Sequence, residues 1–199
     1  MKRLIVGISG ATGAIYGIRL LEVLAKSKVE THLVITEAGE KTIRMETDWK
    51  IEQVNALANV VYDIKDVGAN IASGSFQTDG MVVIPCSIKS LSAIANSFNL
   101  NLLIRAADVT IKERRKLILV VRETPLHKGH LHLMMNLADL GVIILPPAPA
   151  FYFHPKTMDD LINHTVGKVL DLFHIEHDLF ARWGSQKVRN NLRRRGLNH

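Results

Sequence analysis

Residues 3–14 read Arg-Leu-Ile-Val-Gly-Ile-Ser-Gly-Ala-Thr-Gly-Ala, an apolar run that leads into a glycine-rich segment. The run at 3–8 has the continuous Val, Ile and Leu content of a strand that is buried on both faces. Residues 13–26 then place Ile15 and Ile18 on one side of a helix. A buried strand, a glycine turn and a helix in this order predict the first unit of a parallel α/β sheet.

The same alternation continues along the chain. Further strands are predicted at 31–36, 81–84, 117–121 and 142–145, and helices from 36 to 46 and at 87–97, 102–113, 130–140 and 157–173. The pattern predicts a single-domain, three-layer α/β fold of the Rossmann-like or flavodoxin-like kind, with a mostly parallel central sheet. In such folds ligands bind beyond the carboxyl ends of the strands.

The composition is that of an ordinary globular protein, with 47% hydrophobic and 22% charged residues in a chain of 199. Cys86 is the single cysteine, so no intramolecular disulfide forms, which suits a reducing compartment. No apolar run approaches the roughly 20 residues of a membrane span, and no secretory signal pattern is present. We therefore expect a cytoplasmic protein without a membrane segment.

The formal net charge of +6 has a local origin. Six basic residues and no acidic one occur after position 181, namely Arg182, Lys187, Arg189, Arg193, Arg194 and Arg195. We interpret 1–181 as the folded domain and 182–199 as a solvated basic tail. Nucleic-acid binding is not expected, because Trp183 is the only aromatic residue in this tail that a base could stack on.

The glycine-rich segment has the spacing G-x-x-G-x-x-G from Gly7 to Gly13. Glycines allow the backbone to approach a ligand closely, and the N-terminus of the following helix favours an anion. The spacing differs from the dinucleotide pattern G-x-G-x-x-G, and no Walker A lysine follows. Phosphate binding is the favoured interpretation, and a merely tight strand–helix turn is the alternative.

Polar residues also end the other predicted strands. Thr36 ends the second, Ser87 and Ser90 follow the third, and the pair 122–123, Arg-Glu, follows the fourth. Each has an ordinary explanation, as an N-cap or a surface ion pair, and Glu37 keeps a dinucleotide site open. Four polar strand ends in one sheet nevertheless favour a mononucleotide site.

Eight segments of the chain resemble, in order, those of the flavin prenyltransferase (UbiX-like) family. They are Gly-Ile-Ser-Gly-Ala-Thr-Gly-Ala (7–14), Glu-Thr-Asp (46–48), Ser-Gly-Ser-Phe (73–76), Pro-Cys-Ser-Ile-Lys-Ser-Leu (85–91), Arg-Ala-Ala-Asp-Val (105–109), Lys-Glu-Arg-Arg-Lys-Leu (112–117), Arg-Glu-Thr-Pro-Leu (122–126) and Pro-Ala-Phe-Tyr (149–152). The resemblance implies transfer of a dimethylallyl group from dimethylallyl phosphate to N5 and C6 of reduced FMN, without a metal. It also implies a homododecamer with sites at subunit junctions and a UbiD-type decarboxylase that uses the product.

The resemblance also assigns residues. Contacts to FMN are implied for Ser9, Gly10, Ala11, Thr12, Thr36, Ser87, Ile88, Lys89, Ser90 and Arg122. The prenyl phosphate is implied to contact Lys112, Glu123, Tyr152, Lys168 and Trp183, and proton handling is implied for Thr12, Glu46 and Glu123. Thr12 stands where the family often has serine, and its side chain is stiffer at χ1. Lys168 replaces an arginine of some members and loses bidentate phosphate geometry.

Three other functions remain open at this point. An FMN-dependent decarboxylase of cysteine-type substrates would use an early histidine, but His32 lies inside a predicted strand, and an Asn-containing loop, but 134–136 falls in a predicted helix. Direct decarboxylation of aromatic acids and simple flavin carriage are the further alternatives. The histidines near 130 are spaced by two or three residues and are not expected to hold a metal together.

Overall fold

The computed structural model describes residues 1–184. They belong to two compact units, Met1–Pro147 and a second that begins at Ala148, and each is described by itself below. The single folded domain at 1–181 that the sequence indicates stays a prediction. Of the predicted basic tail, residues 185–199 lie outside the described residues.

The elements follow one another in the alternating order that the sequence predicts. The first unit contains β1 (Lys2–Ile8), α1 (Ala14–Leu24), β2 (Val29–Ile35), α2 (Glu37–Glu46), α3 (Ile51–Asn55), β3 (Val60–Tyr62), the 3-10 helix η1 (Asn70–Ala72), β4 (Gly80–Cys86), α4 (Ile88–Ala95), α5 (Leu102–Lys112), β5 (Lys116–Val121), α6 (Lys128–Asp139) and β6 (Ile143–Ile144). The second unit contains α7 (Met158–Leu172). The short elements α3, β3 and η1 are not predicted from the sequence.

The strands form one sheet in the order β3-β2-β1-β4-β5-β6, and every neighbouring pair is parallel. β1 pairs with β2 along its whole length, from Lys2 opposite Val29 to Ile8 opposite Ile35. The chain winds outward from β1 in one direction and then from β4 in the other, so the direction of winding changes between these two central strands. The α/β fold with a parallel sheet is thereby confirmed.

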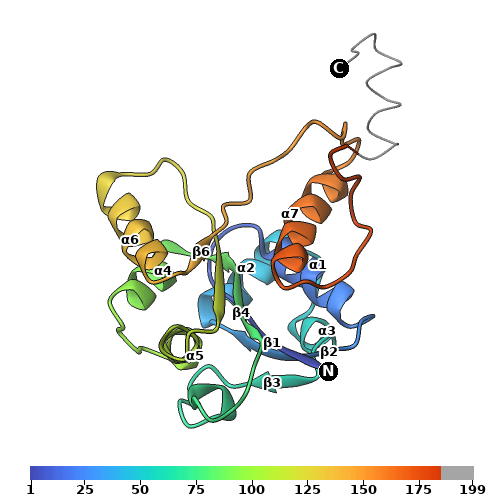
Figure 1. The fold of residues 1–199 in the computed structure, drawn as a ribbon. Coiled ribbons are helices and arrows are strands. Elements are labelled where there is room, and N and C mark those ends of the chain that lie inside the picture. Colours follow the sequence, from blue (N-terminus) through green and yellow to red (C-terminus); the bar gives the residue numbers. More distant parts are fainter. Residues whose placement is uncertain (185–199) are drawn as a thin grey trace. The chain divides into compact units, whose positions relative to one another are not determined.

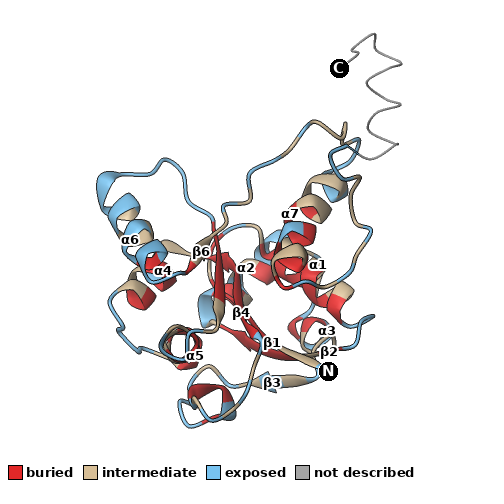
Figure 2. Ribbon diagram, in the orientation of Figure 1, coloured by how far each residue is buried: buried red, intermediate tan, exposed pale blue. Residues whose placement is uncertain are grey.

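Helices cover both faces of the sheet, which gives the three predicted layers (Figure 1). α1 and α2 lie on one face, and α4, α5 and α6 lie on the other. The four central strands β1, β2, β4 and β5 are mostly buried, whereas the edge strands β3 and β6 are only partly buried (Figure 2). Ile5, Met81 and Leu119 belong to the core under α4 and α5, and they are at most 2% exposed. Burial of side chains of this size contributes about 1.5–3 kcal/mol each.

Among residues 1–184, no helix combines the length and the apolar character that crossing a membrane requires.

Helix α1 packs closely on β4 at Gly17. Alanine stabilises a helix by up to about 1 kcal/mol relative to glycine, but a methyl group on Gly17 would overlap the carbonyl oxygen of Ile84, a main-chain atom that cannot rotate away. Because overpacking costs about 1–3 kcal/mol, we expect Gly17→Ala to lower the free energy of unfolding in urea by about 1–2 kcal/mol. Gly68→Ala is the control, since the nearest atom to its methyl would be 3.6 Å away. A stabilised Gly17→Ala protein would contradict this packing.

Candidate active site

The carboxyl ends of β1, β2 and β4 open onto one cavity of about 580 Å³. Gly10, Thr36 and Ser87, which follow these three strands, all line it. The cavity lies where the winding of the sheet changes direction, the place where parallel α/β folds bind ligands. The sequence predicts this juxtaposition, and the structure brings the three strand ends together.

The hydroxyl groups at these strand ends cap helices, as the ordinary interpretation expects. Thr36 Oγ1 accepts the N–H of Gly39 at 3.0 Å, and Ser87 Oγ accepts the N–H of Ser90 at 3.3 Å. Ser87 also donates its own proton to Ser90 Oγ at 3.2 Å. A capping oxygen acts as an acceptor, so the hydroxyl protons of Thr36 and Ser90 stay available to a ligand. Capping and ligand binding are therefore compatible roles for these residues.

Two helix N-termini and several lysines give the cavity a positive character. The first N–H groups of a helix have no partner within the helix, and those of Ala38 in α2 and Lys89 in α4 belong to residues that line the cavity. Lys41 and Lys65 line it as well, and Lys65 lies 3.7 Å from the carboxylate of Glu37, the one acidic residue among the described lining residues. Helix N-termini and lysines both favour an anion, so the donor set fits a phosphate group. Lys41 and Lys65 were not recognised from the sequence.

Ser9 joins the loops that follow β1 and β4. Its buried hydroxyl donates to the carbonyl of Pro85 at 3.0 Å and accepts the N–H of Ser87 at 2.8 Å. Gly10 follows directly, and a Cβ at this position would overlap Ala38 at the start of α2. The loop after β1 is thus held by the hydrogen bonds of Ser9 and by the close packing of Gly10 on Ala38. Ser9 acts in the structure as a link between two loops, and its predicted contact with FMN stays a prediction.

The N-terminus of α1 is bonded to a carboxylate from the same chain. Glu46 Oε2 accepts the N–H of Gly13 at 2.7 Å and the N–H of Ala14 at 3.4 Å. Gly13 has a φ of 93°, a left-handed conformation that favours glycine. Thr12 precedes Gly13 and is exposed. Two residues to which the resemblance gives proton-handling roles, Thr12 and Glu46, therefore lie close together.

Because of this contact, the N-termini of α2 and α4 are better placed to bind an anion than the N-terminus of α1. The glycine spacing predicts a phosphate at the turn before α1, but Glu46 already bonds two N–H groups at that helix end. The N-termini of α2 and α4 carry no such carboxylate contact among the described residues, and both border the cavity. Gly10 still lines the same cavity, so the first loop borders the space next to the N-termini of α2 and α4.

Arg122 follows β5 and lies close enough to Tyr16 in α1 to influence its ionisation. Burial raises the pKa of Tyr16, and the positive charge of Arg122 opposes this shift. The phenol therefore stays protonated near pH 7 and remains a hydrogen-bond donor. Tyr16 was not recognised from the sequence. Glu123 is exposed, and its carboxylate accepts the N–H of Thr124 at 3.0 Å.

Cys86 and His32 have structural surroundings. Cys86 is fully buried, and burial raises the pKa of its thiol far above the ordinary value, which removes the thiolate needed for nucleophilic chemistry. The two ring nitrogens of His32 lie 2.9 Å from Tyr62 Oη and 3.0 Å from Glu30 Oε1. His32 is thus a partnered core histidine. Among residues 1–184, no group of three His, Cys, Asp or Glu side chains is arranged to hold a metal.

The second unit brings together three of the residues that the resemblance assigns to the prenyl phosphate. The ring of Tyr152 meets that of Trp183 edge-on, with the centroids 5.3 Å apart. Tyr152 Oη lies 3.5 Å from Nε2 of His164 in α7. Lys168 is one turn further along α7 and exposed, so His164 and Lys168 share a helix face.

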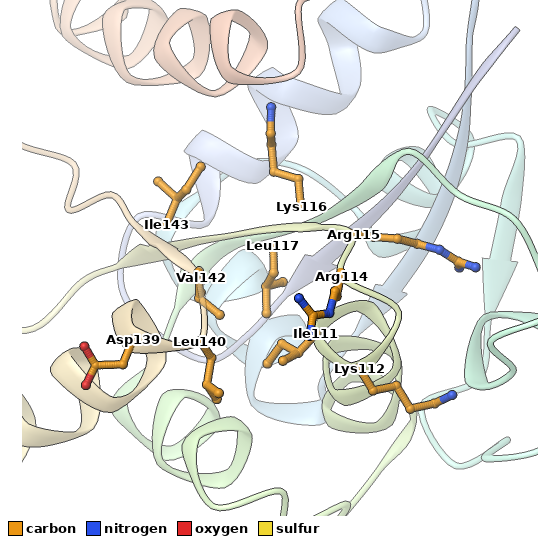
Figure 3. A pocket seen from close by; sticks show the side chains of 11 residues that line it. Ile111, Lys112, Arg114, Arg115, Lys116, Leu117, Asp139, Leu140, Val142 and Ile143 are labelled. Atoms are coloured by element: carbon orange, nitrogen blue, oxygen red, sulfur yellow. The ribbon is translucent and has the colours of Figure 1, made fainter.

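Lys112 lies at the other end of the sheet from Glu123. It ends α5, just before β5 begins, and forms an ion pair with Glu113 at 2.5 Å, whereas Glu123 follows the carboxyl end of β5. Lys112 lines a different cavity, of about 700 Å³, together with Leu117 and Val142 (Figure 3). Within one copy of the first unit, the structure does not bring Lys112 together with the strand-end residues.

An all-parallel sheet of this order, with an anion-binding cavity at the change of winding, is the arrangement of a nucleotide-binding flavoprotein. The family model described as Flavoprotein matches residues 1–170. The flavin prenyltransferase UbiX of Thauera aromatica is 59% identical over 187 residues, which cover 94% of this chain and 96% of the relative. The chain belongs to the flavin prenyltransferase family.

Two solved structures support the same relationship. The crystal structure of AnUbiX in complex with FMN and dimethylallyl pyrophosphate has a TM-score of 0.91 and 47% identity, over 92% of this chain and 98% of that one. The dodecameric FMN-dependent UbiX-like decarboxylase from Escherichia coli O157:H7 has a TM-score of 0.90 and 49% identity, over 92% and 100% of the two chains. The fold and the family named in the sequence analysis are confirmed.

Glu46 variants separate the charge of the carboxylate from its hydrogen bonds. Glu46→Ala removes both and should lower the free energy of unfolding by about 1 kcal/mol, the usual effect of losing an N-terminal cap. Glu46→Gln keeps an acceptor for Gly13 and should lose about half as much. Urea unfolding measures both, with Glu40→Ala on the same helix as the control, because the carboxylate of Glu40 forms an exposed ion pair with Arg44 and no bond to the loop before α1 is described for it. Equal stability of all four proteins would show that Glu46 does not hold the loop.

Proposed function

We propose that the chain transfers a dimethylallyl group from dimethylallyl phosphate to N5 and C6 of reduced FMN, yielding prenylated FMN. The observation that carries this proposal is the 59% identity to a flavin prenyltransferase across nearly the whole of both chains. The cavity at the strand ends adds physical support, because its donors fit a phosphate monoester. Reduced FMN supplies the nucleophilic N5 and C6 atoms.

The FMN site in this proposal is built on the first unit. Thr36, Ser90 and the N-termini of α2 and α4 hold the phosphate, and Lys89 adds charge. Arg122, whose charge acts on Tyr16, adds a further contact from the end of β5. The remaining contacts are those that the resemblance implies, namely Ser9, Gly10, Ala11, Thr12, Ser87 and Ile88. Thr12 and Glu46, which lie next to each other, hold and move the proton near N5.

The prenyl-phosphate site draws on the second unit. Departure of phosphate leaves negative charge on its oxygens and cationic character on the allyl carbon. Lys168 and the hydroxyl of Tyr152 stabilise the first by fixed electrostatics. The ring of Trp183, which packs against Tyr152, stabilises the second by a cation–π contact of about 0.5–2 kcal/mol. Glu123 returns a proton to the departing phosphate.

Lys112 enters this site from a second copy of the chain. The strand-end residues of its own first unit, Glu123 included, lie at the opposite end of the sheet, so we propose that Lys112 acts at a site of another subunit. A structural relative is dodecameric, and we propose the same assembly here. The prenylated flavin would then serve a UbiD-type decarboxylase, and the single buried cysteine suits a cytoplasmic setting.

A decarboxylase acting directly on cysteine-type or aromatic acids is the second candidate function, because one close structural relative is named as an FMN-dependent decarboxylase. The partnered core position of His32 disfavours the cysteine-type version. Incubation with reduced FMN and dimethylallyl phosphate, followed by mass spectrometry of the flavin, decides between them. A flavin of unchanged mass would overturn the proposed function.

The two sites should be separable by mutation. Lys168→Ala and Tyr152→Phe each remove one phosphate contact and should reduce transition-state stabilisation by about 2–4 kcal/mol, by analogy with loss of an oxyanion donor. Both variants should still bind FMN, and excess dimethylallyl phosphate should partly rescue them if the lost contact mainly binds the ground state. Fluorescence titration gives the FMN affinity, and product formation gives the turnover. Arg122→Ala is the comparison, because it should weaken FMN binding. Loss of FMN by all three variants would mean one fused site.

A further inference from the structure

His164 is placed against Tyr152 by its surroundings in the second unit. Its ring stacks on Phe153 with an interplanar angle of 11° and centroids 5.3 Å apart, and Phe180 lies 4.8 Å away on centroids. These contacts fix the plane of the imidazole. In that plane Nε2 lies 3.5 Å from Tyr152 Oη, the outer limit of a hydrogen bond. Neither the motifs nor the resemblance assigns His164 a role.

The charges around His164 keep it neutral near pH 7. Burial lowers its pKa below the ordinary value, the charge of Lys168 lowers it further, and Asp171 opposes the shift. Asp171 is itself engaged by Arg182 at 2.6 and 3.0 Å and by His177 at 3.1 Å. A neutral imidazole with its proton on Nε2 donates to Tyr152 Oη. The phenolic proton is then directed to another acceptor.

Lys168 supplies the second half of the arrangement. It lies one turn after His164 on the same face of α7, and among residues 1–184 no ion-pair partner is described for it. The Tyr152 hydroxyl, 3.5 Å from the imidazole, and the Lys168 ammonium group, whose charge acts on it, thus give a hydrogen-bond donor and a cation near one ring. A tetrahedral dianion such as a phosphate monoester takes donors of both kinds.

We propose that His164 is a positioning residue for the phosphate group of the substrate. His164 does not contact the substrate. It donates a hydrogen bond to the Tyr152 oxygen, so that the Tyr152 hydroxyl proton points to the departing phosphate beside Lys168. The proposal rests on the proposed function, since it concerns the same dimethylallyl phosphate. It assigns a third residue to the anion site of the second unit.

Two substitutions separate this role from packing. His164→Phe keeps an aromatic ring against Phe153 but cannot donate to Tyr152, whereas His164→Gln places an amide N–H at about the reach of Nε2. We expect His164→Phe to lower kcat/KM for dimethylallyl phosphate about three- to tenfold, the effect of one hydrogen bond. His164→Gln should stay within about twofold of the wild type. The KM for reduced FMN should be the same in all three proteins.

The assay is product formation from reduced FMN under anaerobic conditions, with dimethylallyl phosphate varied and the unfolding midpoint measured for each variant. Equal kcat/KM values for His164→Phe and the wild type would overturn the proposal, as would a His164→Gln variant as impaired as His164→Phe. Failure of the wild type to prenylate FMN would instead overturn the proposed function, so the two failures are distinguishable.

A double-mutant cycle tests whether His164 acts through Tyr152. In a Tyr152→Phe background the hydroxyl is already absent, so adding His164→Phe should change kcat/KM by less than about twofold. Independent roles would make the two losses multiply. Multiplied losses would overturn the positioning role even if each single variant were impaired.

Discussion

All six strands of the sheet run in the same direction, and β1 lies between β2 and β4. Because parallel strands need crossover helices, and these crossovers are right-handed, the helices that leave β1 and β4 must cover opposite faces. The loops after these two strands therefore diverge and leave a crevice between them. Five of the residues that the resemblance assigns to FMN line the cavity at this crevice, namely Gly10, Thr36, Ser87, Lys89 and Ser90.

The electrostatics of the crevice follow from how helix ends are satisfied. Helices α1, α2 and α4 all begin at this edge of the sheet. The carboxylate of Glu46 accepts an N–H bond at the N-terminus of α1. Side-chain hydroxyls cap α2 and α4, and the caps leave some of the N–H groups at these two helix ends for a ligand. A single acidic residue thus divides three similar helix ends into one that is closed to anions and two that are open.

Hydrophobic patterning predicts the main helices to within a few residues. It also predicts every strand except β3. β3 is missed because Val60–Tyr62 is three residues long and only half-buried at the edge of the sheet, so it has neither the length nor the burial that make a strand visible in sequence. The strand-end residues Thr36, Ser87 and Arg122 are predictable, since topology alone gathers them. The bond from Glu46 to Gly13 depends on how α2 packs beside α1, and no local pattern encodes it. Tyr152, Lys168 and Lys112 were found by resemblance only.

Helix α2 has one functional group at each end: the cap residue Thr36 lines the cavity, and Glu46 bonds the turn before α1. Ten residues at 1.5 Å per residue separate these groups by about 15 Å. One inserted residue would rotate Glu46 by about 100° around the helix axis and turn its carboxylate away from Gly13, while Thr36 stayed in place. The length of α2 is therefore as constrained as its sequence, because it fixes the distance and the relative orientation of Thr36 and Glu46.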